Sequence, residues 1–233
     1  MRGDVRMRII VSMTTWVKRI CQCEPTLLDI LNQDRKPDLF VINLDRENFP
    51  NGYDDLPEFM KKLDRENENL EIHFEEKDMH VYEKFIPTIR RYTDDYILVT
   101  IDCDTNYPKE YLTEVEKNME GYDWLCTFDD VLTRGQECVY GPAAVRALRE
   151  EIDDELMKNV PLDDHLVLYV LAKHHLKRGH KTKCRTSDRQ AGYSFRRYFV
   201  KTDDVSKLND TTCEYPKEEF IKEYGYMHKR GIV

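Results

Sequence analysis

Short apolar runs, each ending in polar or charged side chains, recur along the chain at the spacing of alternating strands and helices. The runs predict buried strands over 8–13, 39–44, 70–74, 96–101 and 123–128. Between them, apolar residues three and four positions apart predict helices over 25–32, 56–63 and 81–92. Strands and helices that alternate in this way form a mostly parallel sheet with helices on both faces. We therefore expect an α/β fold with three layers in the order α/β/α.

Two carboxylates follow the strand expected over 96–101. Asp102 and Asp104 are one residue apart, so in extended backbone they point to the same side, with α-carbons about 6.5 Å apart. Ligands of open α/β sheets bind beyond the carboxyl ends of strands, and two such carboxylates can share one hard divalent cation. That cation would neutralise a diphosphate leaving group. An acidic turn that caps the next element is the other interpretation, since Asn106 and Pro108 follow.

Polar and basic residues also follow the other strands of the expected sheet. The loop after the first strand, from Thr14 to Arg19, has a composition that suits stacking on a base and contact with phosphate. An ordinary strand-to-helix connection is an equal alternative for this loop. Right-handed crossovers bring the carboxyl ends of parallel strands to one edge, so these loops should meet the two aspartates there. The side chains in question are Thr14, Thr15, Trp16, Arg19, Asp45 and Lys84.

The charge of the chain argues against some classes of partner. Its 233 residues carry a formal net charge of −9, which disfavours nucleic acid and an anionic membrane bound through bulk charge. A basic patch over 174–183 would suit a membrane surface locally. Seven cysteines, an odd number without metal or disulfide spacing, favour reduced thiols. Without a run of about eighteen apolar residues or an apolar signal core, we expect a cytoplasmic protein with no membrane span, peripheral at most.

Three segments resemble a family of bacterial and viral glycosyltransferases of the GT-A fold, family 2-like and containing a DxD motif. Segment 11–20 resembles the family's opening, Ser-Leu-Thr-Ser/Thr-Tyr-Pro-x-Arg-Ile, with Val17 where proline is usual. Segment 82–88 is similar to its Tyr-Lys-Lys-Leu-Ile-Pro. Segment 100–108 is similar to its Thr-x-Asp-Asp-Asp-x-x-Tyr-Pro, with Cys103 in place of the middle aspartate. Smaller matches lie in register between them, and the resemblance covers most of residues 8–210.

The resemblance implies a GT-A enzyme, hexosyltransferase-like, that moves a sugar from a nucleotide-diphosphate sugar to a glycan or lipid-linked hydroxyl acceptor. UDP is the commoner nucleotide, with GDP and dTDP open. Asp102 and Asp104 would hold Mn²⁺ or Mg²⁺, and Asp102 would also contact the nucleotide. His228 would be a third metal ligand, whereas a plain exposed histidine is the alternative. The other nucleotide contacts would fall to Thr14, Thr15, Trp16, Arg19, Asp45 and Lys84, with Lys84 facing phosphate.

The second half of the chain would hold the acceptor. Gly141, next to a proline that starts a helix, resembles the family's glycine-rich segment at the sugar site, where glycine allows close backbone approach. Asp163 and Asp164 resemble its Asp-Asp-x-Trp motif, with Leu166 where tryptophan is common. We favour Asp164 as the base of an inverting transfer and keep Asp163 as the close alternative. The other interpretation is that both acids only stabilise a helix N-terminus.

No linker or repeat divides the chain, so we expect one domain over 1–233. Its nucleotide-binding half would cover about 8–108, its acceptor half about 109–213, and a helix and tail 214–233. Two other functions stay open. A nucleotidyltransferase shares the sheet and the acids but normally carries a glycine-rich basic signature after the first strand. A non-catalytic module that binds nucleotide sugar would lack turnover.

Overall fold

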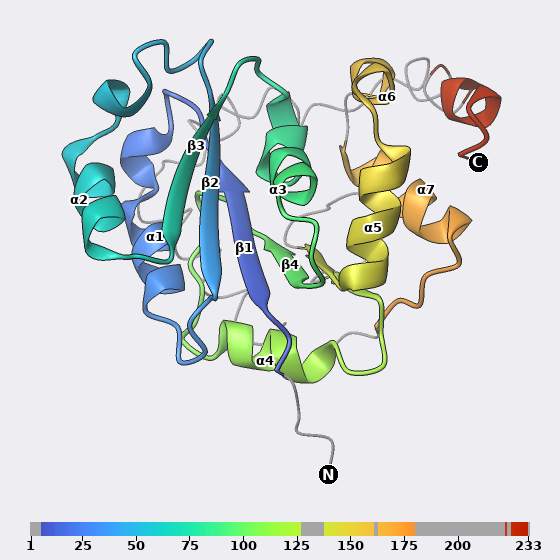
Figure 1. Ribbon diagram of the computed structural model, residues 1–233, viewed down its shortest axis with the longest axis horizontal. Coiled ribbons are helices and arrows are strands. Elements are labelled where there is room, and N and C mark those ends of the chain that lie inside the picture. Colours follow the sequence, from blue (N-terminus) through green and yellow to red (C-terminus); the bar gives the residue numbers. More distant parts are fainter. Residues whose placement is uncertain (1–5, 127–137, 161–162, 180–221, 223–224, 233) are drawn as a thin grey trace, which may run out of the picture.

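A six-stranded sheet in the order β3-β2-β1-β4-β6-β5 forms the centre of the molecule (Figure 1). The computed structural model describes residues 6–126, 138–160, 163–179, 222 and 225–232. β1 pairs in parallel with β2 and β4, and β2 with β3, while β6 runs antiparallel to β4 and β5. The strands are β1 Ile9–Thr14, β2 Leu39–Asp45, β3 Leu70–Glu75, β4 Ile97–Thr100, β5 Trp124–Cys126 and β6 Cys138–Tyr140. The mostly parallel sheet confirms the expected class.

Helices cover both faces of the sheet and complete the three layers. Apolar side chains of α1, α2 and α4 pack in one core, and those of α3, α5, α6 and α7 pack in the other. None of the helices in the described ranges is long and apolar enough to cross a membrane. The helices are α1 Glu24–Leu31, α2 Glu58–Glu66, α3 Ile86–Arg91, α4 Tyr111–Asn118, α5 Pro142–Glu151, α6 Asp154–Asn159 and α7 Asp163–Lys173. Three short 3₁₀ helices are η1 Ile20–Gln22, η2 Gly52–Asp55 and η3 His80–Lys84.

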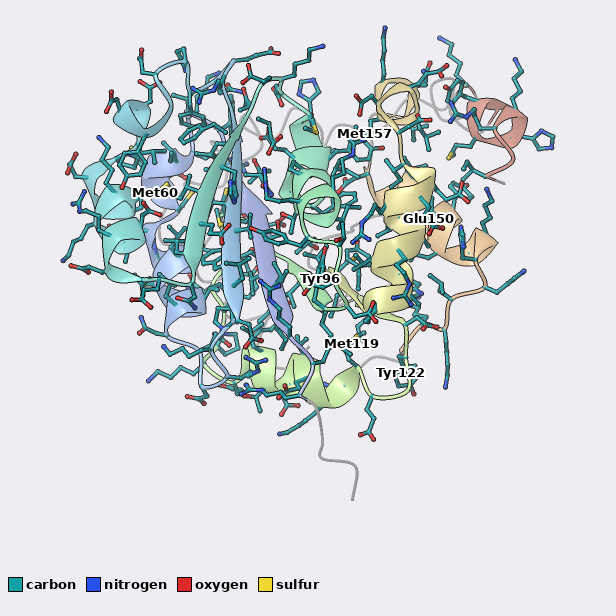
Figure 2. All side chains as sticks on the ribbon, viewed as in Figure 1. Met60, Tyr96, Met119, Tyr122, Glu150 and Met157 are labelled. Carbon is teal, nitrogen blue, oxygen red and sulfur yellow. The ribbon has the colours of Figure 1, made fainter. Side chains whose placement is uncertain are left out.

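The central strands are mostly apolar because both of their faces are covered. In β1, Ile9 and Val11 belong to one core and Ile10 to the other, and all three are fully buried. A strand buried on both sides loses the alternation of apolar and polar residues that a half-exposed strand has. Figure 2 labels members of both cores: Met60, Met119 and Tyr122 in the first, Tyr96 and Met157 in the second.

One expected helix is divided in two. The segment 81–92 forms the end of η3 and then α3, with Phe85 between them at φ −142° and ψ −33°. A continuous helix would place Pro87 in its interior, where the ring lacks an N–H and clashes with the carbonyl four residues earlier. Pro87 is instead in the first turn of α3, where its missing N–H costs nothing. The division leaves Glu83 and Lys84 on a short 3₁₀ turn at the sheet edge.

Three elements were not expected from the pattern, namely α4, β6 and α6. The strand expected over 123–128 is observed as β5, and its last two residues lie outside the described ranges. A helix expected over 216–224 also falls almost entirely outside them.

Candidate active site

The carboxyl ends of the parallel strands meet at one rim of the sheet, as expected. Thr14 ends β1, Asp45 ends β2, and the loop 101–108 follows β4 with both aspartates of the DxD sequence. We call residues 101–108 the acid loop. η3, which follows β3, reaches the same rim, because the Thr14 hydroxyl donates to Glu83 at 2.9 Å. The rim therefore collects residues from four separate connections.

Helix α1 is joined to the acid loop by hydrogen bonds. The Thr26 hydroxyl is bonded to two carbonyl oxygens of the loop, those of Cys103 at 3.0 Å and Thr105 at 2.8 Å. The Asp29 carboxylate accepts the Tyr107 N–H at 2.9 Å. Thr26 is fully buried, so these bonds are shielded from water. The backbone that carries both aspartates is therefore fixed to a helix rather than left to solvent.

Basic side chains lie against the acids of this loop. The Lys84 ammonium nitrogen is 3.8 Å from Asp102 Oδ1 and 3.4 Å from Asp163 Oδ2. Arg19 Nη1 is 3.4 Å from Asp104 Oδ2. All five side chains are largely buried, and the most exposed of them, Asp102, keeps 24% of its surface. We call Asp102, Asp104 and Asp163 the paired acids. Lys84 joins the strand that leads into the acid loop to the start of α7.

A buried polar network under the rim fixes the position of η3. Ser12 Oγ donates to the Lys84 carbonyl oxygen at 2.6 Å and shares a hydrogen bond with Thr88 Oγ1 at 2.7 Å. Asn43 Nδ2 donates to Thr88 Oγ1 at 2.8 Å. Ser12, Asn43 and Thr88 are each fully buried, so the network ties β1 and β2 to η3 and α3 inside the protein.

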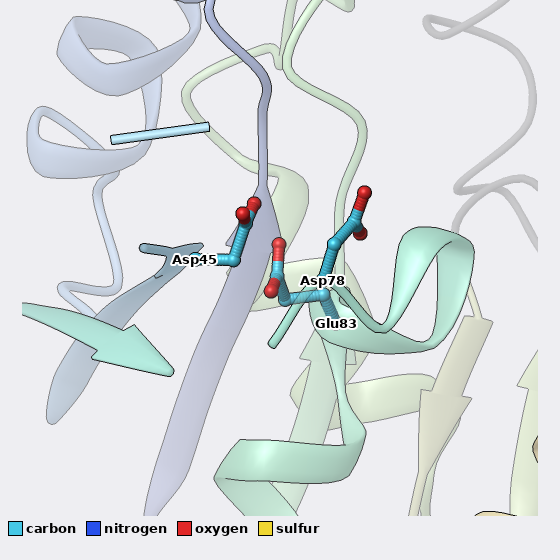
Figure 3. Close-up of side chains that lie close together, drawn as sticks. All are labelled: Asp45, Asp78 and Glu83. Atoms are coloured by element: carbon cyan, nitrogen blue, oxygen red, sulfur yellow. The ribbon is translucent and has the colours of Figure 1, made fainter. Parts of the chain in front are cut away.

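A second group of acids lies at the same rim. Asp45, Asp78 and Glu83 each offer a carboxylate oxygen within 4.8 Å of the others, and Figure 3 shows the three side chains close together. We call these three residues the acidic cluster. Asp45 accepts the Asn48 N–H at 2.7 Å and the Asn48 side-chain amide at 2.9 Å. Glu83 accepts from Thr14 through Oε2, whereas its Oε1 is buried with no hydrogen-bond partner among the described residues.

The environment of Glu83 favours its neutral form. The pKa of Glu83 is raised from its ordinary value of 4.5 to about 8, chiefly because the buried carboxylate loses its water. The hydrogen bond from Thr14 opposes this rise, and the negative charges of Asp45, Asp78 and Glu75 contribute to it. A raised pKa of this kind marks a carboxyl group that holds a proton or another positive partner at neutral pH.

The first loop directs Arg19 to the acid loop. The Trp16 carbonyl accepts the Arg19 N–H at 2.9 Å, which closes a turn. Lys18 lies over the Trp16 ring with its nitrogen 4.7 Å from the ring centre. Thr15 is buried and accepts a hydrogen bond from the Cys23 thiol at 3.3 Å. Trp16 is half-buried, so part of its ring is accessible for the stacking role predicted for it.

Comparison with known proteins bears on the fold. No protein-family model and no curated protein matches the chain. The structure of residues 1–349 of the glycosyltransferase TarS from S. aureus in complex with UDP matches at a TM-score of 0.51 and 16% identity, covering 70% of this chain and 54% of that one. A second structure of TarS 1–349 matches at a TM-score of 0.48 and 13% identity, covering 72% and 56%.

The chain has a GT-A-like glycosyltransferase fold. It spans about half the length of the TarS chains that it matches. An identity of 16% shows the fold alone, so residue roles have to be argued from the site itself.

The requirement for glycine at position 141 has a packing reason within this glycosyltransferase fold. A Cβ on Gly141 would meet the Asp123 carbonyl oxygen and the Met119 methyl group at 3.0 Å each. The Gly141 N–H donates to that same carbonyl at 2.8 Å. The close backbone approach is therefore to Asp123, and a role of Gly141 at a sugar site stays a prediction.

The structure does not place the side chains of two predicted site residues, Asp164 and His228, at the rim. Asp164 is in the first turn of α7, and its side chain is outside the described part of the structure. His228 is exposed, and its neighbour Arg230 pairs with Glu155 of α6 at 3.2 Å. Within the described residues, the group of three possible metal ligands is the acidic cluster, so the structure does not assemble His228 with the two aspartates of the DxD sequence. The metal role of His228 stays a prediction.

Sequence reasoning missed Asp78 and Glu83. Asp78 is in the run Glu75–Glu76–Lys77–Asp78, which has the composition of a solvated loop. Glu83 gives a weak signal, because it is an acid among apolar residues, Tyr82 and Phe85, that are buried. The contact of Lys84 with Asp163 joins segments far apart in sequence, and local spacing gives no sign of it.

Proposed function

We propose that the chain is a metal-dependent glycosyltransferase that moves a sugar from a nucleotide-diphosphate sugar, a UDP-sugar, to a hydroxyl of a glycan or lipid-linked acceptor. The observation that carries the proposal is the Lys84 ammonium between Asp102 and Asp163, at 3.8 and 3.4 Å. It links the acid that would hold donor and metal to an acid that would serve the acceptor. The fold shared with TarS in its UDP complex supports a nucleotide-sugar donor.

The residues of the acid loop fit a divalent cation. Asp102 and Asp104 offer carboxylate oxygens, and the Asn106 side-chain oxygen in the same loop is buried without a hydrogen-bond partner among the described residues. Hard oxygen ligands of this kind suit Mg²⁺ or Mn²⁺. When bound, the cation would supply positive charge against the diphosphate leaving group.

Arg19 and Lys84 would bind and orient the donor. Each is now paired with a carboxylate, at 3.4 to 3.8 Å, and largely buried. A diphosphate brings more negative charge and more acceptor oxygens than one carboxylate, so it competes for both groups. As the bond from the anomeric carbon to the diphosphate oxygen breaks, charge grows on that oxygen. Fixed cationic groups stabilise such charge because they need no rearrangement at the moment of reaction.

An aspartate at the start of α7 would take the proton of the acceptor hydroxyl as its oxygen attacks the anomeric carbon. Asp163 is 93% buried beside Lys84, and this contact supports its membership of the site. Asp164 is the other candidate. If diphosphate takes Lys84, the Asp163 carboxylate is released from this contact and can face the acceptor hydroxyl.

Product analysis tests the proposal and separates the alternatives. Purified protein is incubated with a panel of UDP-, GDP- and dTDP-sugars and Mn²⁺, and released nucleotide is measured with and without chelator. Release of UDP that requires the metal is the expected result. Release of pyrophosphate would identify a nucleotidyltransferase, and binding without any turnover would identify a non-catalytic module. Metal-independent UDP release would refute the metal role.

Two matched variants test the base. Asp163→Asn and Asp164→Asn are each compared with Asp94→Asn, which changes an acid paired with Arg8 just before β4, at the opposite end of that strand. Loss of the base should lower kcat about 10²–10⁴-fold while UDP affinity stays unchanged. An acid that only orients Lys84 should instead raise the donor KM with little change in kcat. Unchanged kcat in both variants would refute an aspartate base on α7.

A further inference from the structure

We propose that Asp45, Asp78 and Glu83 hold a divalent cation of their own, of Ca²⁺ type, separate from any metal at the acid loop. Three carboxylate oxygens from three segments lie within 4.8 Å of one another (Figure 3). Ca²⁺ takes oxygens at about 2.3–2.6 Å, so its ligand atoms stand up to about 5 Å apart. Mg²⁺ binds at about 2.0–2.1 Å and gives up water reluctantly, which suits a buried site less.

The orphan oxygen of Glu83 points to a missing partner. Glu83 is 2% exposed, and its Oε1 has no hydrogen-bond partner among the described residues while Oε2 is bonded to Thr14. Buried polar atoms in folded proteins are almost always satisfied, because an unsatisfied one costs free energy. The Glu83 side chain extends toward Asp45 in Figure 3, so a cation among the three carboxylates would lie within reach of Glu83.

The charge around the acidic cluster calls for a positive partner. The paired acids have Lys84 and Arg19, with side chains that are about 15% exposed. In the described residues, the basic group that contacts the cluster is His80, 3.1 Å from Asp78, and its side chain is 80% exposed. A solvated imidazole offsets little of the negative charge of Asp45 and Asp78. A cation among the three carboxyl groups would neutralise that charge, displace the proton of Glu83 and satisfy its buried oxygen.

The burial of the cluster limits the size of its ligand. Asp45 is 1% exposed, and only the Asp78 side chain, at 24%, opens to solvent. An ion can enter beside Asp78, whereas a nucleobase or a sugar has no exposed surface of Asp45 or Glu83 to contact. The burial of Asp45 therefore argues against the nucleoside contact expected for it from the sequence. Asp45 also keeps both hydrogen bonds to Asn48, which hold its carboxylate in place as a ligand.

Binding here would fasten the end of β2, the loop before η3, and η3 itself. Because Lys84 follows Glu83 directly, the cation would also fix the backbone that carries the lysine of the proposed donor site. The inference does not require that the chain transfer sugars, and its test is independent of turnover.

Thermal unfolding of the chelator-treated full chain with added CaCl₂ tests the site. The double variant Asp102→Asn, Asp104→Asn removes the acid-loop ligands, so any remaining shift reports the acidic cluster. We expect Ca²⁺ at about 100 times its Kd to raise the Tm of this variant by roughly 5–10 °C. Adding Glu83→Gln should abolish the shift, whereas Glu58→Gln, which changes an exposed glutamate of α2, should keep it.

A second variant guards against a misfolded control. Asp78→Asn changes the partly exposed ligand and should fold, as circular dichroism checks, while it weakens Ca²⁺ binding at least tenfold in titration calorimetry. No Tm shift in the double variant would overturn the inference. An equal Tm shift after Glu83→Gln would also overturn it. So would a double variant that Ca²⁺ does not stabilise and whose Tm rises on Glu83→Gln without Ca²⁺, because a proton alone would then satisfy Glu83.

Discussion

Two groups of acids share one rim of the sheet and differ in their partners. The paired acids lie against Lys84 and Arg19, whereas the acidic cluster includes a buried Glu83 oxygen that has no hydrogen-bond partner in the described part of the chain. The two groups are divided at consecutive residues, because Glu83 faces the cluster and Lys84 faces the paired acids. A 3₁₀ turn rotates by about 120° per residue, so neighbouring side chains point to different places.

The difference separates two kinds of ligand. A site that already contains cationic side chains can exchange its carboxylates for a ligand with negative charge, such as a diphosphate. A site with carboxylates and no buried cation accepts positive charge, as a proton or a metal. The short turn η3 therefore places Glu83 in the acidic cluster and Lys84 among the paired acids.

The largest expected effect is on the rate of sugar transfer, when a carboxylate of the acid loop is removed. Asp104→Ala should lower sugar transfer at least about 10³-fold, because it deletes a proposed metal ligand and removes the ion pair that Asp104 makes with Arg19. The Tm should fall by only a few degrees, and Asp94→Asn should leave transfer unchanged. Initial rates of UDP release at saturating Mn²⁺ measure the effect. Wild-type rates in Asp104→Ala would disprove the role of the acid loop in holding metal.

The acidic cluster should make stability depend on pH. The pKa of Glu83 is raised to about 8 by burial in the folded protein, from 4.5, so the folded state binds the proton more tightly. Its contribution to stability is full below pH 4.5, falls as pH rises, and is lost above pH 8. Between pH 5 and 8 the loss should amount to about 3 kcal/mol in chelator.

Glu83→Gln should remove this slope, because glutamine does not titrate. Urea unfolding of wild type and variant at pH 5, 6, 7 and 8 measures the difference, with Glu58→Gln as the exposed control. Parallel pH profiles of wild type and Glu83→Gln would contradict a neutral Glu83.

Replacing Lys84, which lies between Asp102 and Asp163, tests whether the paired acids and the acidic cluster are separate sites. Lys84→Met should lower kcat/KM about 10²-fold, because the paired acids lose the cation that they share with the diphosphate. UDP affinity, measured by calorimetry, should fall with it. Lys117→Met, which removes an exposed lysine of α4, is the control. Calcium binding at the acidic cluster should survive in Lys84→Met, and its loss would mean that the two groups of acids are one site.

The smallest expected effect concerns the support of the acid loop. Thr26→Val should cost about 1–3 kcal/mol of stability, because it leaves the Cys103 and Thr105 carbonyl oxygens without their buried donor. Transfer should fall severalfold through misplacement of the aspartates, while the pH slope from Glu83 stays. Thr113→Val on α4 is the matched control. Equal effects of the two substitutions would argue against a specific support by Thr26.

The parallel half of the fold was readable from sequence because its strands are buried on both faces. Runs such as Leu39–Leu44 are apolar except for the buried Asn43, and this run ends at Asp45, which reaches the rim. β6 was missed because three residues, Cys138–Tyr140, give no period to detect. The expected helix over 81–92 was too long at its start, because Phe85 leaves the helical conformation and α3 begins only at Ile86, with Pro87 in its first turn.

The candidate site was readable only where its residues are consecutive in sequence. Asp102 and Asp104 stand together, and their rim location follows from strand order. Lys84 and Asp163 come together only through the packing of η3 beside α7, which is a long-range contact. The acidic cluster depends in the same way on a loop that brings Asp78 to the end of β2. Spacing along the chain holds no record of such contacts.

The attachment of the acid loop to α1 has a consequence for affinity. Thr26 and Asp29 already hold the loop backbone in one conformation, so no ligand has to immobilise it. Pre-organisation of this kind spares the conformational entropy that a floppy loop would lose on complex formation. Substitutions at Thr26 or Asp29 of α1 should therefore lower the affinity for the proposed donor.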